Sequence, residues 1–294
     1  MGRLAQTRGD HVFDVVNYLI LSLVTILVLY PLVFVLSASF SSPAAVIEGQ
    51  VWLLPKQVNV QSYIRVFQDD GIMRGYINTL IYTCAGTAVN MLLTIGAAYP
   101  LSRKDFVGRH MLTMIFAFTM FFSGGLIPTY LLVKNLGLLN SIWAIILPSA
   151  VSMWNIIIMR TFFQGIPVEL QESAQIDGCT NLRMLWSIIL PLSMPVIAVM
   201  LLFYGIGHWN SFFNALIYLS DSQKYPLQLI LRQILLQNQM GSMVSGSETS
   251  VDQLMLTEGL KYAVIIVSSL PVLLLYPFLQ RYFVKGVMIG AIKG

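Results

Sequence analysis

The residue types that most often carry out covalent chemistry are few and scattered in this sequence. The two cysteines are Cys84, inside an apolar run, and Cys179, in a polar stretch. The three histidines are His11, His110 and His208, and neither they nor the cysteines have the spacing of a metal site. The sequence also lacks a G-x4-G-K-[ST] phosphate-binding loop. We therefore expect a chain that is not an enzyme and that holds no metal and no cofactor of its own.

The most informative polar pattern is residues 165–195, GIPVELQESAQIDGCTNLRMLWSIILPLSMP. Pro167 suits the first position of a helix, and residues 168–176 are mostly good helix formers. Asp177-Gly178 follows, and glycine is the usual residue just past a helix end because it accepts a positive φ. The pattern predicts a short surface helix, a break, and a second amphipathic piece that leads through Pro191 and Pro195 into an apolar segment.

Composition places this polar segment in a membrane protein. Of the 294 residues, 56% are hydrophobic and only 10% are charged, and the mean hydropathy is +0.75. Soluble domains usually carry about 25% charged residues, so this chain has too few charges to cover a water-facing surface. The net charge of +4 fits Lys and Arg at the inner ends of membrane spans better than nucleic-acid binding.

Six apolar segments have the length of a transmembrane helix, about 20 residues. They contain no Lys, Arg, Asp or Glu, each of which costs about 2.5 to 3.5 kcal/mol at the bilayer centre. The first is too long for the core of a cleaved signal peptide. We expect an all-α, polytopic membrane protein with about six transmembrane helices, which are Val15–Leu36, Ile77–Leu101, Met111–Leu132, Ile142–Met159, Leu192–Leu219 and Tyr262–Leu279.

The distribution of Lys and Arg predicts that both termini are cytoplasmic. The clearest indication is the short loop SRKDFVGR at 102–109, because basic residues in short loops favour the inner side. Of the outer loops, 37–76 is expected to be partly amphipathic, 133–141 to be a short turn, and 220–261 to be long with a mobile Ser/Gly-rich stretch. Residues 1–294 are expected to form a single membrane domain.

The polar segment also contains a motif with a specific spacing. Glu172-Ser173-Ala174 is followed by Gly178 after three intervening residues, then by Ile188 and by Leu190-Pro191. This resembles the signature E-A-A-x3-G-x9-I-x-L-P of permease subunits of bacterial ABC importers. Ser173 departs from it where the family favours Ala; the side chain stays small but gains a hydroxyl.

The resemblance implies a type I ABC importer permease fold in which 165–191 is a cytoplasmic coupling-helix segment. In the family this segment lies in a surface cleft of the ATPase subunit, so Glu172, Ala174, Asp177 and Gly178 would form the docking core. The small side chains would let the helix enter the cleft, Glu172 could pair with a basic residue there, and Gly178 would let the chain reverse.

Other stretches resemble the smaller permease subunit of maltose-type carbohydrate importers. They are residues 74–103, 121–148 and 209–219, together with the ending RYFVKGVMIGAIKG at 281–294. The resemblance covers nearly everything from residue 13 onward. Within the family it points to subunits that handle oligosaccharides from acidic or plant and algal polysaccharides, such as the alginate-oligosaccharide importer.

The resemblance also implies the partners. They are a second permease subunit that forms a heterodimer, two ATPase subunits that bind Mg-ATP, and an extracytoplasmic solute-binding protein, all at the bacterial cytoplasmic (inner) membrane. In the family the C-terminal tail can reach the ATPase interface, so Lys285, Lys293 and Gly294 are candidates for a second contact. A simple basic anchor on the inner side is the alternative for this tail.

The fifth apolar segment holds the candidates for the substrate path, which are Tyr204, His208, Trp209, Asn210 and Asn214. Polar groups at this depth are costly unless they are paired or face water. Trp209 could stack on a sugar, and Asn210 and Asn214 share one helical face. The alternative, which we favour at this stage, is that the polar side chains, with Asn78, Asn90 and Asn155, bond neighbouring helices and that Trp209 belongs to an interfacial aromatic belt.

Two other classes of transporter stay open from the sequence. One is a permease of the same superfamily for an amino acid, a peptide or phosphate. The other is an ion-driven secondary transporter, which would need charged residues inside the membrane, and the six segments have none. An embedded enzyme would need a convergent catalytic set, which the isolated His208 does not supply.

Overall fold

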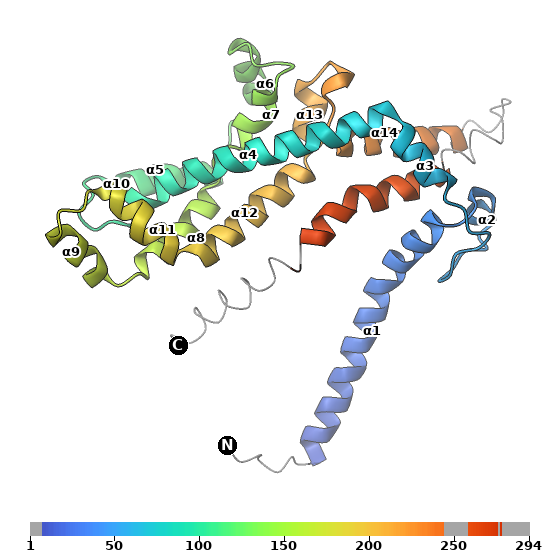
Figure 1. Ribbon diagram of the computed structural model, residues 1–294, viewed down its shortest axis with the longest axis horizontal. Coiled ribbons are helices and arrows are strands. Elements are labelled where there is room, and N and C mark those ends of the chain that lie inside the picture. Colours follow the sequence, from blue (N-terminus) through green and yellow to red (C-terminus); the bar gives the residue numbers. More distant parts are fainter. Residues whose placement is uncertain (1–7, 244–257, 276, 278–294) are drawn as a thin grey trace. The chain divides into compact units, whose positions relative to one another are not determined.

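The computed structural model describes residues 8–243, 258–275 and 277, and within these ranges the ordered elements are helices without strands. Figure 1 labels them in chain order. The larger helices are α1 (Arg8–Ser39), α4 (Asp70–Ser102), α5 (Arg109–Phe121), α6 (Leu126–Asn135), α8 (Met153–Gln164), α12 (Met194–Trp209), α14 (Leu227–Met243) and a further helix, Glu258–Leu275. The smaller ones are α2 (Pro43–Ile47), α3 (Gln61–Gln68), α7 (Ile142–Ile146) with its 3-10 turn η1 (Leu147–Ser149), α9 (Val168–Ile176), α10 (Asn181–Met184), the π-helical turn η2 (Leu185–Ile189), α11 (Leu190–Leu192), α13 (Phe213–Tyr218) and the 3-10 turn η3 (Ser222–Lys224).

Within the described residues, the helices make up to six apolar passages, if each bent pair counts as one. Three are single helices long enough to cross a bilayer, Gly9–Ser39, Asp70–Ser102 and Glu258–Leu275. Three more are pairs of shorter helices joined at a bend, with angles of 114°, 56° and 84°. The structure therefore confirms a polytopic all-α membrane protein, but half of the passages are broken rather than straight.

The third predicted span, Met111–Leu132, is wrong as a single helix. Helix α5 ends at Phe121 and α6 begins at Leu126, and the two are bent by 114°. Gly125 lies between them with φ +82°, a conformation that glycine adopts without the steric cost that other residues meet. The Gly124-Gly125 pair thus ends one helix and redirects the chain into the next.

The fifth predicted span, Leu192–Leu219, is also interrupted. Helix α12 ends at Trp209, and α13 begins only at Phe213. The backbone N–H groups of Asn210 and Ser211 still bond to the last turn of α12, at 3.0 and 3.1 Å, so these residues form its C-cap. Hydropathy alone does not register this stop because the apolar character continues beyond it.

The predicted loops contain more helix than the sequence suggested. Residues 37–76 include α2, α3 and the first turns of α4, which begins at Asp70 rather than at Ile77. The long loop 220–261 includes α14, and most of its Ser/Gly-rich stretch lies outside the described residues. The short turn between 133 and 141 is confirmed, since α6 ends at Asn135 and α7 begins at Ile142.

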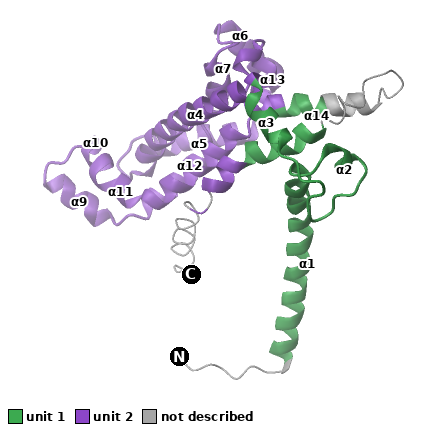
Figure 2. Cartoon of the chain, turned by 45° about the vertical axis from the view of Figure 1, so that its right-hand side comes forward, with its two compact units in different colours: residues 1–69, 231–269 green, residues 70–230, 270–294 purple. Residues whose placement is uncertain are grey.

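The chain divides into two compact units, shown in different colours in Figure 2. Unit 1 comprises residues 1–69 and 231–269. Its small core joins the end of α1 to α2 and to the last helix, through Ala38, Ala45, Val51 and the edge-to-face pair Phe34–Tyr262 with ring centroids 6.0 Å apart. Most of α1 is exposed within the chain, as expected of a helix that faces lipid or another subunit. A single membrane domain over 1–294 stays a prediction.

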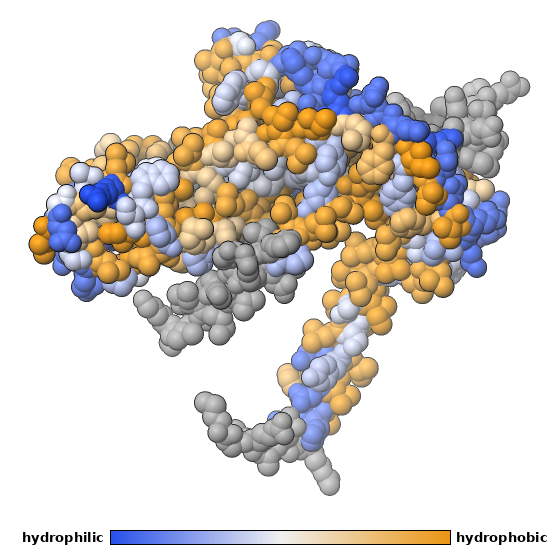
Figure 3. Space-filling model, viewed as in Figure 1, coloured by the Kyte–Doolittle hydropathy of each residue, from blue (hydrophilic) through white to orange (hydrophobic). Residues whose placement is uncertain are grey.

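Unit 2 comprises residues 70–230 and 270–294 and contains the main core. Helix α4 packs along α8 and α12, and the segment α9 to α11 closes one end of this core. Figure 3 shows hydrophobic surface along these long helices and a gathering of hydrophilic residues over the end that carries α9 and α10. The polar segment is therefore presented at one end of an apolar bundle.

Candidate functional site

The segment 165–191 folds as its sequence predicts. Pro167 was expected at the first helical position and is instead the N-cap of α9, immediately before it. The helix runs to Ile176. Gly178 has φ +73°, and the N–H groups of Gly178 and Cys179 bond back to α9 at 3.0 and 2.9 Å. The side chain of Thr180 then caps the start of α10. The glycine thus ends one short helix and lets the next begin at once.

The residues of the motif fall into two groups with different surroundings. Glu172, Ser173, Asp177 and Gly178 are exposed on or just after α9. Ala174 is 7% exposed and lies in the core cluster of unit 2. Only a small side chain keeps the helix this close to the core, so Ala174 anchors α9 while its other face stays accessible.

The second half of the motif belongs to the core rather than to the surface. Ile188 packs against the main cluster and Leu190 is buried in it, while Pro191 is exposed in the short helix α11. Their spacing from Gly178 fixes where the chain re-enters the bundle. In this structure their place favours support of α9 over direct contact with a partner.

The loop 102–109 holds α9 and α10 against the end of α4. Arg103 forms two bonds of 3.0 Å with the carboxylate of Asp105 and donates through Nη1 to Oε1 of Gln171 at 2.7 Å. Beside it, the Tyr99 hydroxyl donates to the carbonyl of Asn181 at 3.2 Å. The Arg103 hydrogen bond is the main cause that lowers the pKa of Asp105 below its ordinary value, so this pair is charged at neutral pH.

A hollow of about 940 Å³ lies between this loop and α9. Its polar lining includes Arg103, Asp105, Gln171 and Glu172. No group of three or more His, Cys, Asp or Glu side chains that could hold a metal ion occurs among the described residues. Arg103 and Asp105 line the hollow from the loop, and Gln171 and Glu172 line it from α9.

Two of the candidate path residues are buried and bonded inside unit 2. The hydroxyls of Tyr204 and Thr94 lie 2.6 Å apart, and Nε2 of His208 lies 2.6 Å from Oδ1 of Asn90. The Asn90 amide donates to the carbonyls of Ser149 and Ala150 at 2.7 and 3.0 Å. Its Oδ1 must therefore accept, so Nε2 of His208 carries the proton.

The other three candidates lie near the end of α12 and beyond it. Trp209 is buried and meets Tyr76 edge to face, with ring centroids 5.6 Å apart. Asn210 is exposed and lies 3.4 Å from the amide of Gln228. Asn214 donates to the carbonyl of Ile145 at 3.4 Å. The structure does not bring these five side chains into one cavity, and their part in a substrate path stays a prediction.

The expectation that Asn78 and Asn90 bond neighbouring elements is confirmed. Asn90 bonds as described, and Asn78 donates to the carbonyls of Gln223 and Tyr225 at 2.8 and 3.1 Å. Both are on α4, and Asn90 lies in a polar stripe along this helix that the sequence reasoning did not single out. The stripe consists of Thr79, Thr83, Thr87, Asn90 and Thr94, whose steps of three and four residues are the signal that would have found it.

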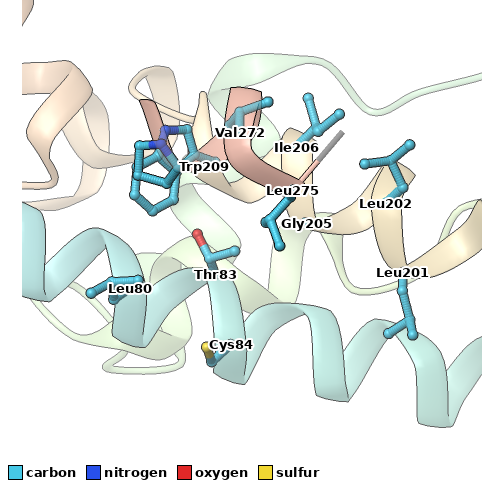
Figure 4. A pocket seen from close by; sticks show the side chains of 11 residues that line it. Leu80, Thr83, Cys84, Leu201, Leu202, Gly205, Ile206, Trp209, Val272 and Leu275 are labelled. Atoms are coloured by element: carbon cyan, nitrogen blue, oxygen red, sulfur yellow. The ribbon is translucent and has the colours of Figure 1, made fainter. Parts of the chain in front are cut away.

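An apolar cavity of about 300 Å³ borders this stripe (Figure 4). Leu80, Thr83 and Cys84 of α4 line one side, Leu201, Leu202, Gly205, Ile206 and Trp209 of α12 another, and Pro271, Val272 and Leu275 the third. The Thr83 hydroxyl points into the cavity and has no hydrogen-bond partner in this structure. The remaining candidates, Lys285, Lys293 and Gly294, lie outside the described residues.

Fold and site together define a polytopic helical membrane protein that exposes a short polar helix at one end of its core. Comparison with known proteins identifies the family. The family model described as binding-protein-dependent transport system inner membrane component matches residues 1–289. The chain belongs to this family.

Similar proteins of known name cover nearly the whole chain. Protein LplC of Bacillus subtilis is 42% identical over 98% of this chain and 97% of its own length. The polygalacturonan/rhamnogalacturonan transport system permease protein YtcP of the same species is also 42% identical, over 97% of this chain and 99% of its own. Among solved structures, a chain of a bacterial ABC transporter involved in import of the acidic polysaccharide alginate has a TM-score of 0.86 at 33% identity, covering 96% of this chain and 100% of that one. The chain is thus a permease component of an ABC importer, as its motif predicts.

Proposed function

We propose that this permease takes up oligosaccharides of acidic, uronate-containing polysaccharides, delivered by an extracytoplasmic solute-binding protein. Two observations on related proteins support this substrate class. A relative at 42% identity is named for polygalacturonan and rhamnogalacturonan, and a structural neighbour at 33% identity belongs to an alginate importer. All three polymers consist wholly or partly of uronic acids.

The proposed complex has the chain as one of two permease subunits, with two ATPase subunits that supply the energy. The observation that carries this is α9, an exposed helix anchored by Ala174 and terminated by Gly178 at φ +73°. It offers Glu172, Ser173 and Asp177 to a partner. In this arrangement the termini and α9 face the cytoplasm, α9 enters the ATPase cleft, and closure of the ATPase pair turns the permease outward.

The C-terminal tail is proposed as a second contact to the ATPase. Its basic residues Lys285 and Lys293, with the terminal Gly294, have the charge that favours the inner side of the membrane. The substrate path is proposed to run beside the end of α12, where Asn210 is exposed and the buried Trp209 lines an apolar cavity.

The test is reconstitution of the complex in liposomes with its binding protein. ATP hydrolysis should be stimulated by the binding protein loaded with oligogalacturonate or oligoalginate, and much less by malto-oligosaccharide. Stimulation by the neutral sugar alone would overturn the substrate class. Purification of the chain as a solitary protein that transports without an ATPase would overturn the whole assignment.

A further inference from the structure

Helix α9 is attached to the rest of unit 2 by few contacts. Of its side chains, only Ala174 is buried. The remaining hydrogen bonds of α9 stay within the helix and its caps. Within the part of the chain that the structure describes, the bond from Arg103 to Gln171 is the one side-chain hydrogen bond that joins α9 to another helix or to the loop 102–109. A helix so attached can transmit force only through these two points and through its own ends.

Arg103 is placed to hold several groups at once. Its Nε and Nη2 both bond to Asp105 at 3.0 Å, which fixes the plane of the guanidinium. That plane directs Nη1 to Gln171 at 2.7 Å and to the sulfur of Met184 at 3.4 Å. The side chain is only 10% exposed although it carries a charge. A planar fork with five donors can make these contacts together, and a lysine ammonium cannot.

The space around Arg103 increases the share of its guanidinium in attaching α9 to the end of α4. It lines a hollow of about 610 Å³ on the side of α10 and one of about 940 Å³ on the side of α9, and Asp105 lines both. Apart from the buried Ala174, which lies in the same core cluster as Leu101 of α4, the side of α9 that faces the pair borders open space. Arg103 directly follows α4, and near the same end of that helix the Tyr99 hydroxyl donates to the carbonyl of Asn181.

We propose that Arg103 is a positioning residue that passes the displacement of α9 to α4. The inference rests on the proposed function, in which the ATPase subunits move α9. From Arg103 the displacement continues along α4 to α12, because the buried pairs Thr94–Tyr204 and Asn90–His208 join the two helices at 2.6 Å each. Asp105 holds the guanidinium in the orientation that reaches Gln171.

The experiment measures sugar imported per ATP hydrolysed in the reconstituted complex, with four variants. Arg103→Met and Gln171→Leu should each lower this ratio by about tenfold, the factor that loss of one charge-assisted hydrogen bond corresponds to. Arg103→Lys should restore part of the ratio because it keeps a charge beside Asp105. Lys134→Met, which removes a positive charge from an exposed position on α6, is the control and should leave the ratio unchanged.

The double variant Arg103→Met with Gln171→Leu separates positioning from general damage. If the two side chains act through their shared bond, the double variant should have the same ratio as either single one. Two independent losses that multiply would overturn the inference. If the Arg103→Met complex does not assemble, Gln171→Leu alone tests the proposal, because Gln171 is half-exposed and its replacement should not disturb the fold. A Gln171→Leu complex with the same sugar-to-ATP ratio as the wild type would equally overturn the proposal.

Failure of the inference and failure of the proposed function give different results. If the unmodified complex does not link ATP hydrolysis to uptake at all, the proposed function is wrong. If the unmodified complex does so and Gln171→Leu keeps its full ratio, only the role of Arg103 is wrong.

Discussion

Replacement of Gly86 by alanine tests how closely α4 and α12 pack. A Cβ atom at this position would lie 2.5 Å from both Cε1 and Nε2 of His208. Contacts below 3.0 Å are not tolerated, so the imidazole would have to move. The ring is held by its 2.6 Å bond to Asn90, whose amide is in turn held by two backbone carbonyls. The added methyl group therefore acts on a rigid arrangement.

The magnitude follows from three terms. Overpacking a close-packed site costs about 1 to 3 kcal/mol. Loss of the bond between His208 and Asn90 adds about 0.5 to 1.5 kcal/mol. Alanine improves the helix by about 1 kcal/mol relative to glycine. The sum predicts that Gly86→Ala lowers the free energy of unfolding by about 0.5 to 3.5 kcal/mol.

The assay is thermal unfolding of the purified complex in detergent, with Gly96→Ala as the control. Gly96 is in the same helix, but a Cβ there meets nothing within 4 Å, so its variant should be as stable as the wild type or more stable. Gly86→Ala should unfold several degrees lower. With His208→Ala added, the second loss should be smaller than in the wild-type background, because the clashing ring is gone. Equal midpoints for Gly86→Ala and Gly96→Ala would refute the close packing of α4 against α12.

Three further predictions concern other parts of the chain. Gly178→Asn should keep the fold of α9, because Asn tolerates a positive φ and a Cβ at this position meets nothing within 4 Å. Gly178→Trp should abolish sugar uptake by the complex without loss of membrane insertion. Uptake by the Trp variant would contradict docking at this turn. Thr94→Val should destabilise the complex by about 1 to 3 kcal/mol because the buried Tyr204 hydroxyl loses its partner. Adding Tyr204→Phe should recover most of this stability. A double variant no more stable than the single one would contradict the pairing. The pKa of Asp105 is lowered in the folded chain. The ionised carboxylate therefore contributes its full stabilisation of the fold above the ordinary pKa of 3.8, and this stabilisation is lost as the pH falls through the lower folded pKa. Asp105→Asn should remove the pH dependence of unfolding in that range, and an unchanged profile would contradict the pair with Arg103.

Local patterns in the sequence were sufficient to predict the secondary structure of the polar segment 165–191. Pro167, the helix formers after it and Gly178 predicted a helix, a break and a second helix in 165–191, and the structure has them in this order. These signals act over a few residues, through backbone conformation and caps, and do not depend on distant packing. The role of the segment came from its motif, and the comparison with known proteins confirmed the family.

Helix breaks within apolar runs were not predictable in the same way. The runs 111–132 and 192–219 contain no charged residue and are strongly apolar on average. The helices nevertheless stop at Phe121 and at Trp209. Hydropathy averages over about 20 residues, so it registers membrane affinity and not the direction of the chain. Gly125 with φ +82° shows that a single glycine can redirect a segment whose composition is unchanged.

The sequence by itself determined that this chain lies in a membrane, that it is helical, and that 165–191 is a capped polar element, since charge content, hydropathy and short-range backbone preferences are properties of local residues. Only the tertiary structure decided that Arg103 joins α9 to α4, that His208 is bonded to Asn90, and that Ala174 is buried while Glu172 is exposed. The partners in each bond are 68 and 118 residues apart in the chain. Such contacts depend on how α4, α9 and α12 pack, and no pattern within one helix specifies its neighbour.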